Sequence, residues 1–332
     1  MPLINRCGGG GGTPQLCGQV ENFKAGLGNL SVILSWTAPN PDEDNSFVGA
    51  RIVRKTGSAP TGINDGTIVY EGTALTYTDT GLTAGTTYYY RAFAYNAKKK
   101  YQTEYRVISI TAMAIQPIQP NFADNTWDTI IEACHSGSVP DTWVVGDSKT
   151  MTIDGVNYQF DIVGKNHDTY TAGGSAPLTF GLHDCYGTVY PMNSSNTNST
   201  GWDGSKMRTE TLPAILAKMP ENIRNGIRPV NKLTATSGSS STTKTASDKL
   251  FTFSEMEVYG SAKYSYRGEG KQYDYYKAGN SKVKKVGSTA SWWWLRSPRA
   301  NNSVSFCAVL SDGSAGMDRA SYEDGVCFGF CF

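Results

Sequence analysis

The residues of this 332-residue chain that could do chemistry are its histidines, its serines and the glycine-containing stretch at Gly268. His135, His167 and His183 are far apart, and none has the H-x-x-x-H spacing that brings two imidazoles to one metal ion. No G-x-S-x-G motif is present to seat a nucleophilic serine. The stretch GEGKQY at Gly268 lacks the third glycine of a dinucleotide-binding fingerprint. We therefore predict no catalytic residue, no metal ligand and no cofactor.

The seven cysteines are the remaining reactive groups, and their odd number and scattered spacing favour buried free thiols over a disulfide framework. Cys327 and Cys331 are four residues apart. In a regular strand they share a face at a separation of about 13 Å, which is too far for a disulfide or a shared metal ion. Val326 and the phenylalanines at 328, 330 and 332 then fill the other face. A final strand buried on both sides is predicted.

The stretch that precedes this strand has a different character. FCAVLSD alternates, with Cys307 and Val309 facing a core and Ala308, Leu310 and Asp312 facing solvent. Further on, SAGMDRASYEDG mixes small, charged and aromatic residues, which make a poor core. Tyrosine and arginine do supply contact area, stacking and directional bonds at interfaces. The stretch therefore indicates a binding surface between two apolar anchors, WWWLRSP and GVCFGFCF.

The composition predicts which elements hold this surface. Hydrophobic residues make up 39% and charged residues 18%, with 36 glycines and 19 tyrosines, a profile typical of β-rich globular domains with many turns. A net charge of +1 gives no reason to expect a nucleic-acid partner. The chain shows no secretory signal and no apolar run long enough to cross a bilayer, so we expect synthesis in a cytoplasm and no membrane insertion.

The first third of the chain has an all-β pattern. LSVILSW places Leu30, Val32, Leu34 and Trp36 on one face of a strand, and six or seven short strands at this spacing suggest a β-sandwich. In LTAGTTYYYRAFAYN one face is shared by Tyr88, Tyr90, Ala92 and Ala94. The Trp36 position and the tyrosine-corner placement of Tyr88 resemble a fibronectin type III domain, a module that serves mostly as a spacer.

Beyond it the pattern changes to mixed helix and strand. The predicted elements are a helix capped at Asn125 or Thr126 and stopped at Gly137, a hairpin turning at Asp154-Gly155, a helical region from Ser205 to Met219 interrupted near Pro213, and a polar loop from Leu233 to Ala246. The predicted domains are a Gly-rich assembly or tether segment at 1–19, the fibronectin type III-like domain at 20–114, a Pro-containing linker at 115–124, and a ligand-binding domain at 125–332.

The C-terminal motifs are specific. The pattern from WWWLRSP to GVCFGFCF, together with TWDTIIEACHSG, IRPVNK and GEGKQYDYY upstream, resembles the variable proteins of diversity-generating retroelements. The resemblance implies an α+β C-type-lectin-like fold related to the formylglycine-generating enzyme, with a variable region at about 291–332. It also implies that a reverse transcriptase scatters asparagine codons of a template into many residue types at fixed, exposed, ligand-facing positions. Carried onto this sequence, those positions are Arg299, Asn301, Val304, Ser305, Ala308, Leu310, Asp312, Gly316, Asp318, Arg319, Tyr322 and Asp324.

The other residues of the region are then scaffold. By the same resemblance these are Trp293, Trp294, Leu295, Pro298, Phe306, Val309, Gly313 and the strand from Gly325 to Phe332. Met317 and Glu323 fit less well, because neither is reachable from an asparagine codon by changing adenines alone. A surface can be diversified only if folding does not depend on it. Exposed substitutions change stability by a few tenths of a kcal/mol, whereas core truncations cost about 2–5 kcal/mol.

The resemblance implies a receptor-binding protein at the tip of a phage tail fibre, active outside the cell as part of a virion made in a bacterial cytoplasm. Its partners would be a host surface protein or glycan, tail proteins at the N-terminus and two further copies in a homotrimer. One alternative is a formylglycine-generating-type copper oxidase using Cys327 and Cys331. A second is a variable lectin-like protein displayed on a bacterial surface. A calcium-dependent lectin is a weaker alternative, since the Glu-Pro-Asn and Trp-Asn-Asp motifs are missing.

Overall fold

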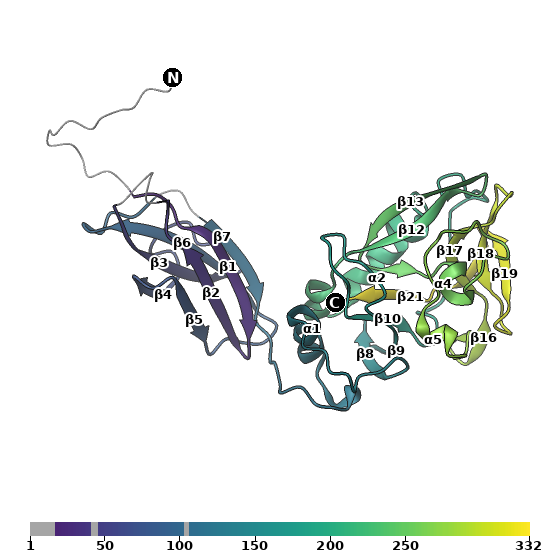
Figure 1. The fold of residues 1–332 in the computed structure, drawn as a ribbon, viewed down its shortest axis with the longest axis horizontal. Coiled ribbons are helices and arrows are strands. Elements are labelled where there is room, and N and C mark those ends of the chain that lie inside the picture. Colours follow the sequence, from purple (N-terminus) through teal and green to yellow (C-terminus); the bar gives the residue numbers. More distant parts are fainter. Residues whose placement is uncertain (1–16, 41–45, 103–105) are drawn as a thin grey trace, which may run out of the picture. The chain divides into compact units, whose positions relative to one another are not determined.

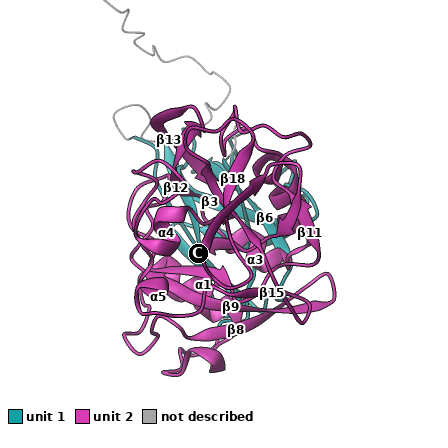
Figure 2. Ribbon diagram, turned by 90° about the vertical axis from the view of Figure 1, so that its right-hand side faces the viewer, with its two compact units in different colours: residues 1–115 teal, residues 116–332 magenta. Residues whose placement is uncertain are grey.

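The structure, a computed structural model, describes residues 17–40, 46–102 and 106–332. It divides into two compact units, residues 1–115 and 116–332, which Figure 1 shows as ribbons and Figure 2 in two colours. The five consecutive glycines at 8–12, and most of the predicted N-terminal segment at 1–19, lie outside the described residues. None of the helices found in the described ranges is both long and apolar enough to span a bilayer.

Unit 1 is built from two antiparallel sheets. One has the order β1-β2-β5 and the other the order β4-β3-β6-β7. The strands are β1 (Glu21–Gly28), β2 (Ser31–Thr37), β3 (Phe47–Thr56), β4 (Thr67–Gly72), β5 (Thr76–Thr80), β6 (Thr87–Asn96) and β7 (Arg106–Thr111). One buried cluster takes side chains from both sheets, including Val32 and Leu34 of β2 and Ile52 of β3. Unit 1 is therefore a β-sandwich, as its strand pattern predicted.

Particular residues of the sandwich also lie where the alternation placed them. Trp36 is buried and its ring centroid lies 5.5 Å from that of Tyr70. Tyr88 accepts a hydrogen bond from the backbone N–H of Thr83 at 3.1 Å, which is the bond expected of a tyrosine corner. Leu30 differs from the prediction. It lies just before β2 with a positive φ of 46° and is 36% exposed.

The segment predicted as a linker, residues 115–124, belongs to the second unit from residue 116 onward. Phe122 is buried against Trp143, with ring centroids 5.4 Å apart. The backbone N–H of Gln119 donates to the Asn125 side chain at 2.8 Å. Residues 116–121 are exposed, as a stiff connector with two prolines would be, and packing in the core begins at the apolar Phe122 side chain.

Unit 2 contains two five-stranded sheets, two hairpins and several short helices. The sheet orders are β14-β21-β10-β9-β8 and β11-β20-β17-β18-β19, with hairpins β12-β13 and β15-β16. The helices are the 3-10 turn η1 (Phe122–Asp124), α1 (Trp127–Ser136), the π-helix η2 (Met207–Thr211), α2 (Leu212–Lys218), α3 (Glu221–Gly226), α4 (Glu255–Tyr259) and α5 (Asp274–Lys277). The strands are β8 (Ser148–Ile153), β9 (Val156–Lys165), β10 (Leu178–Leu182), β11 (Val189–Pro191), β12 (Val230–Ser237), β13 (Ser240–Asp248), β14 (Phe251–Thr252), β15 (Lys284–Val286), β16 (Thr289–Ser291), β17 (Trp293–Pro298), β18 (Ser305–Val309), β19 (Ala315–Arg319), β20 (Glu323–Gly325) and β21 (Phe328–Cys331).

Two local predictions in this unit are confirmed. Helix α1 begins after Thr126, whose side chain accepts from the backbone N–H of Thr129, and ends at Gly137 in the left-handed conformation. Strands β8 and β9 form a hairpin whose turn residues, Asp154 and Gly155, have φ of 51° and 79°. Both positive values match the turn type that Asp-Gly favours.

Two other predictions need correction. The region around Pro213 stays helical: η2 runs directly into α2, and the change from π-helical to α-helical bonding falls at 211–212, next to Pro213, whose ring nitrogen has no hydrogen to donate. The predicted polar loop at 233–246 is instead the β12–β13 hairpin. Its many threonines are β-branched and favour extended backbone, and this outweighs the polarity of the stretch.

Candidate functional site

The backbone of the C-terminal region is anchored by the buried tryptophans of β17. Trp293 and Trp294 have no solvent exposure. The indole N–H of Trp293 donates to the Lys282 carbonyl at 2.9 Å, and that of Trp294 donates to the Tyr190 carbonyl at 2.7 Å. Each indole thus binds a segment distant in sequence, which fixes β17 on both of its faces. The predicted scaffold role of these two residues fits this packing.

A buried network of charges lies behind the same strand. Arg296 of β17 has no solvent exposure and binds the Glu257 carboxylate through two nitrogens, at 2.5 and 2.7 Å. Lys232 binds Glu257 and Asp168, both at 2.7 Å. Burial alone would raise the pKa of the Glu257 carboxyl, but Arg296 and Lys232 hold that pKa below its usual range. Removing one partner from such a network costs about 3–5 kcal/mol, because it leaves another charge buried without compensation.

The last strand closes the fold. β21 pairs with β10, and Phe330 lies opposite Phe180. Phe328, Phe330 and Phe332 are wholly buried, and Phe330 packs against Phe160 with ring centroids 5.3 Å apart. This confirms the prediction of a terminal strand buried on both sides.

Cys327 and Cys331 have different surroundings. Cys327 Sγ lies 3.2 Å from the Leu182 carbonyl, whereas Cys331 Sγ lies 3.4 Å from the Thr179 hydroxyl. Burial raises the pKa of both thiols, and metal binding needs the thiolate. In the described part of the chain, no group of three His, Cys, Asp or Glu side chains is placed to hold a metal ion.

The twelve predicted ligand-facing positions divide by exposure. Those whose side chains are exposed are Asn301, Asp312, Arg319 and Tyr322. Those that are half-buried are Arg299, Val304, Leu310 and Asp318. Those that are buried, contrary to the prediction, are Ser305, Ala308, Gly316 and Asp324. Figure 1 shows β17, β18 and β19, which carry or flank most of these residues, together at the end of unit 2 remote from α1.

The buried positions have a clear physical cause. Ala308 and Gly316 are paired at the middle of the β18–β19 ladder. The Leu310 side chain folds over Gly316, so that a Cβ on Gly316 would lie 2.3 Å from Leu310 Cδ2. Strict alternation predicted exposure for this face, but neighbouring side chains cover its centre. A larger residue at 316 requires Leu310 to rotate away.

The loop between β17 and β18 is held by two segments, the loop that carries Asn198 and the turn of the β12–β13 hairpin. The side-chain amide of Asn198 donates to the carbonyls of Asn302 and Ser305, at 2.8 and 2.7 Å. Gly238, in the hairpin turn, packs so closely that a Cβ on it would lie 1.9 Å from the Asn302 carbonyl oxygen. This hairpin, for which the sequence predicted a polar loop, therefore supports the candidate site.

Asp324 is the most unusual of the twelve. It is 6% exposed, and its Oδ2 is buried with no hydrogen-bond partner. Burial, and secondarily the nearby Asp318 carboxylate, raise the pKa of Asp324 to about 7. A scaffold residue normally has its polar atoms satisfied. This carboxyl therefore has no evident structural role.

Sequence reasoning did not assign Trp292, which the structure places beside Asp324. Trp292 is 37% exposed although the next two tryptophans are wholly buried. The backbone N–H of Gly325 donates to the Trp292 carbonyl at 2.8 Å. Alternation along WWW gave no signal, because it places Trp292 on the same face as Trp294, which is wholly buried. Met317 is half-buried and Glu323 is exposed.

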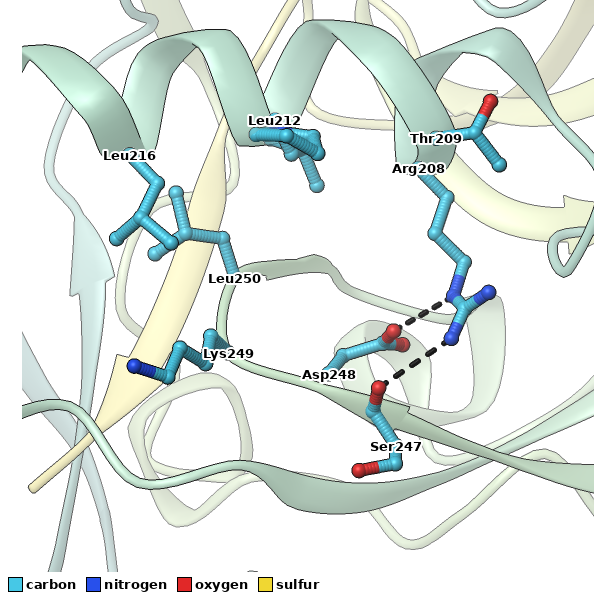
Figure 3. Close-up of a pocket in the computed structure, with 9 residues that line it drawn as sticks. Arg208, Thr209, Leu212, Leu216, Ser247, Asp248, Lys249 and Leu250 are labelled. Carbon is cyan, nitrogen blue, oxygen red and sulfur yellow. Dashed lines mark hydrogen bonds and ion pairs between the residues drawn. The ribbon is translucent and has the colours of Figure 1, made fainter.

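A hollow of about 340 Å³ lies elsewhere in unit 2, along η2 and α2, and is drawn in Figure 3. Arg208 on its wall donates from Nε to Asp248 at 2.6 Å and also reaches the Ser247 carbonyl, so its charge is already compensated. Leu212, Leu216 and Leu250 make the rest of the wall apolar. None of the twelve candidate positions lines this pocket.

Comparison with protein families assigns no activity to this site. A family model described as "Domain of unknown function (DUF6273)" matches residues 180–331, which is less than half of the chain and includes every candidate position. No curated protein matches the sequence.

Comparison with solved structures finds fibronectin type III-like all-β domains. The fibronectin type III domain of human fibronectin type III domain containing protein 3 is 19% identical, with a TM-score of 0.26, over 31% of this chain and 93% of that one. The corresponding domain from human KIAA0970 protein is 18% identical, with a TM-score of 0.26, over 34% and 93%. The FN1–FN3 domains of chicken CNTN1 are 14% identical, with a TM-score of 0.24, over 29% and 32%. Scores of this size carry no argument on their own, and the sandwich fold of unit 1 rests on its own strand pairings.

Proposed function

We propose that this chain is a ligand-binding protein whose C-terminal face, at 299–324, contacts a receptor on a bacterial cell. The observation that carries the proposal is the separation of roles within one short region. Trp293, Trp294 and Arg296 are wholly buried and bonded, whereas Arg319 and Tyr322 are exposed and make no ion pair or ring contact within the described residues. Tyrosine and arginine are the residues most often found to dominate binding energy at interfaces.

The finer form of the proposal follows the resemblance. The exposed positions are those that a diversity-generating retroelement varies. Unit 2 is the C-type-lectin-like domain that binds the ligand, and unit 1 is a spacer. The protein acts at the tip of a phage tail fibre as a homotrimer attached through its N-terminal segment. Several weak sites on one particle then gain avidity, so a single site need not bind tightly.

Cell binding tests the coarse form of the proposal. Fluorescently labelled full-length chain is titrated onto a panel of bacterial strains, and the double variant Arg319→Ala, Tyr322→Ala is compared with the parent. We expect apparent affinity to fall at least tenfold on every strain bound, with the unfolding midpoint unchanged. The matched control is Val156→Ala, which removes a side chain 52% exposed, the same fraction as Tyr322, on a different sheet. Equal losses in both variants would refute the proposed face.

The neighbouring DNA tests the retroelement. We expect a near-copy of the 3′ end of the gene, differing only at adenines, beside a reverse transcriptase gene. Sequencing of the locus decides this directly. Differences at other bases, or at the codons of Trp293 and Trp294, would contradict it.

A further inference from the structure

The buried carboxyl of Asp324 is costly to the folded protein. Neither of its side-chain oxygens forms a hydrogen bond or ion pair in the described part of the chain, and the side chain is 6% exposed. An unpaired buried carboxyl destabilises the fold by the solvation that it loses. Alanine at 324 would avoid that cost. The arrangement is explained if a bound group supplies the missing partner.

The side chains next to Asp324 indicate what that group is. In the parallel ladder Trp293 pairs with Gly325, so Trp292 and Asp324 project from the opposite face of the sheet, on the same side as each other. The Trp294 indole also reaches this place, because it binds the carbonyl of Tyr190, which is paired with Asp324. Tyr322, two residues before Asp324, is 52% exposed. Trp292 and Tyr322, two partly exposed aromatic residues, therefore have backbone positions close to that of Asp324.

The charges around this point favour a positive ligand. Asp318 and Glu323 form no ion pair in the described ranges, and Asp318 is near enough to raise the pKa of Asp324. Asp312 is already bonded to Ser314 at 2.7 Å. No set of three acidic, histidine or cysteine side chains among the described residues is placed to hold a metal ion.

Resting on the proposed function, we propose that Asp324, Trp292 and Tyr322 form a recognition point for a lysine or arginine side chain of a host surface protein. A carboxylate pairs with guanidinium or ammonium by charge-assisted hydrogen bonds, and the face of an indole attracts the same cations. A neutral sugar hydroxyl can donate to a carboxylate, but it brings no charge to offset the loss of solvation. Trp292 would be a constant contact beside positions that vary.

Ionisation of Asp324 controls this recognition. The titratable or charged groups around it are Asp318 from β19, Glu323 on its own strand, Tyr190 from β11, and the Cys185 thiol, which lies against Gly325 on the other face of β20. The cations nearest to these groups are Arg319, which follows Asp318 in the chain, and Lys284, which acts on the Cys185 thiol, and neither is among the causes of the raised pKa of Asp324. Binding of a positive group should therefore strengthen between pH 6 and pH 8, as the carboxyl loses its proton.

The experiment uses the full chain labelled with ¹⁵N, and follows the tryptophan indole signals while small probes are added. The probes are N-acetyl-arginine amide, N-acetyl-lysine amide, the neutral N-acetyl-citrulline amide, methyl α-mannoside and calcium chloride. We expect arginine and lysine amides to shift the Trp292 signal at pH 8, with citrulline at least tenfold weaker. Asp324→Asn and Trp292→Leu should each weaken arginine binding at least tenfold, and Val156→Ala should leave it unchanged.

Other outcomes overturn the proposal. An equal response to arginine and citrulline would remove the role of charge. A stronger response to mannoside or calcium would identify a sugar or a metal site instead. Unchanged arginine binding in folded Asp324→Asn and Trp292→Leu would place the contact elsewhere. Asp324→Asn and Trp292→Leu leave Arg319 and Tyr322 in place, so these two variants separate the recognition point from the proposed function. Their failure leaves the proposed function to be judged by the cell-binding test.

Discussion

Replacing Asp324 with asparagine should stabilise unit 2 at neutral and alkaline pH. The folded protein holds the Asp324 proton up to about pH 7, whereas the unfolded chain releases it near the ordinary value of 3.8. Between these two values the folded state binds more protons than the unfolded state, so the free energy of unfolding falls as pH rises. The amide of asparagine is uncharged at every pH in this range, so the free energy of unfolding of the variant does not fall for this reason.

The size of the effect follows from the same two values. The difference between about 7 and 3.8, at 1.36 kcal/mol for each pH unit, gives about 4 kcal/mol. The variant should therefore gain about 4 kcal/mol over the parent as pH rises from 4 to 8, with most of the gain below pH 7. An energy of this size is a large part of the stability of an ordinary domain.

Urea unfolding followed by tryptophan fluorescence measures this gain. Six of the seven tryptophans lie in unit 2, so the signal reports mainly on that unit. Parent and Asp324→Asn are compared at pH 4, 5, 6, 7 and 8. Parallel stability curves for the two proteins would refute the reasoning, because they would mean that Asp324 titrates alike in the folded and unfolded states.

Three further predictions concern other parts of unit 2. Trp294→Ala should cost about 3–5 kcal/mol in urea unfolding, because it empties a buried site and leaves a carbonyl unpaired; a loss below 1 kcal/mol would contradict its anchoring role. Glu257→Gln should cost about 3–5 kcal/mol, because Arg296 and Lys232 then stay buried without their shared carboxylate; Glu257→Asp, which keeps the charge, should cost less. The pKa of His183 is raised by its hydrogen bond to Asp161, so this contact stabilises fully below about pH 6.5 and is lost as pH rises through the folded value. The unfolding midpoint of His183→Gln should therefore fall below that of the parent at pH 5.5 and converge with it at pH 8.5, and a constant difference would contradict the assignment.

Local signals in the sequence were enough to predict the elements whose ends are marked by capping or turn residues. Thr126 and Gly137 mark the two ends of α1, and Asp154-Gly155 marks the β8–β9 turn, because each residue type is suited to the backbone angles required there. The alternation of β6 and of the terminal strand was equally clear. These features depend on neighbours in sequence, so they can be predicted without knowing the fold.

What the sequence concealed depends on long-range packing. The β12–β13 hairpin looked like a loop because its side chains are polar, although its threonines favour extended backbone, and its contact with the Asn302 loop could not be predicted from neighbours in sequence. Ala308 was predicted to be exposed from alternation and Gly316 from the resemblance, and neither source tells which side chains cover a residue. Trp292 was unassigned because three adjacent tryptophans give no indication of which one projects outward.

A saturation scan of residues 291–332, sorted for folding by protease resistance of the displayed chain, tests the central claim most directly. The claim is that folding energy lies in the buried ends of this region and that the exposed side chains between them are free to vary. The account predicts that nearly all substitutions are tolerated at Asp312, Arg319 and Tyr322, and that almost none are tolerated at Trp294 or Phe330. Intolerance at Arg319 and Tyr322 equal to that at Trp294 would contradict it.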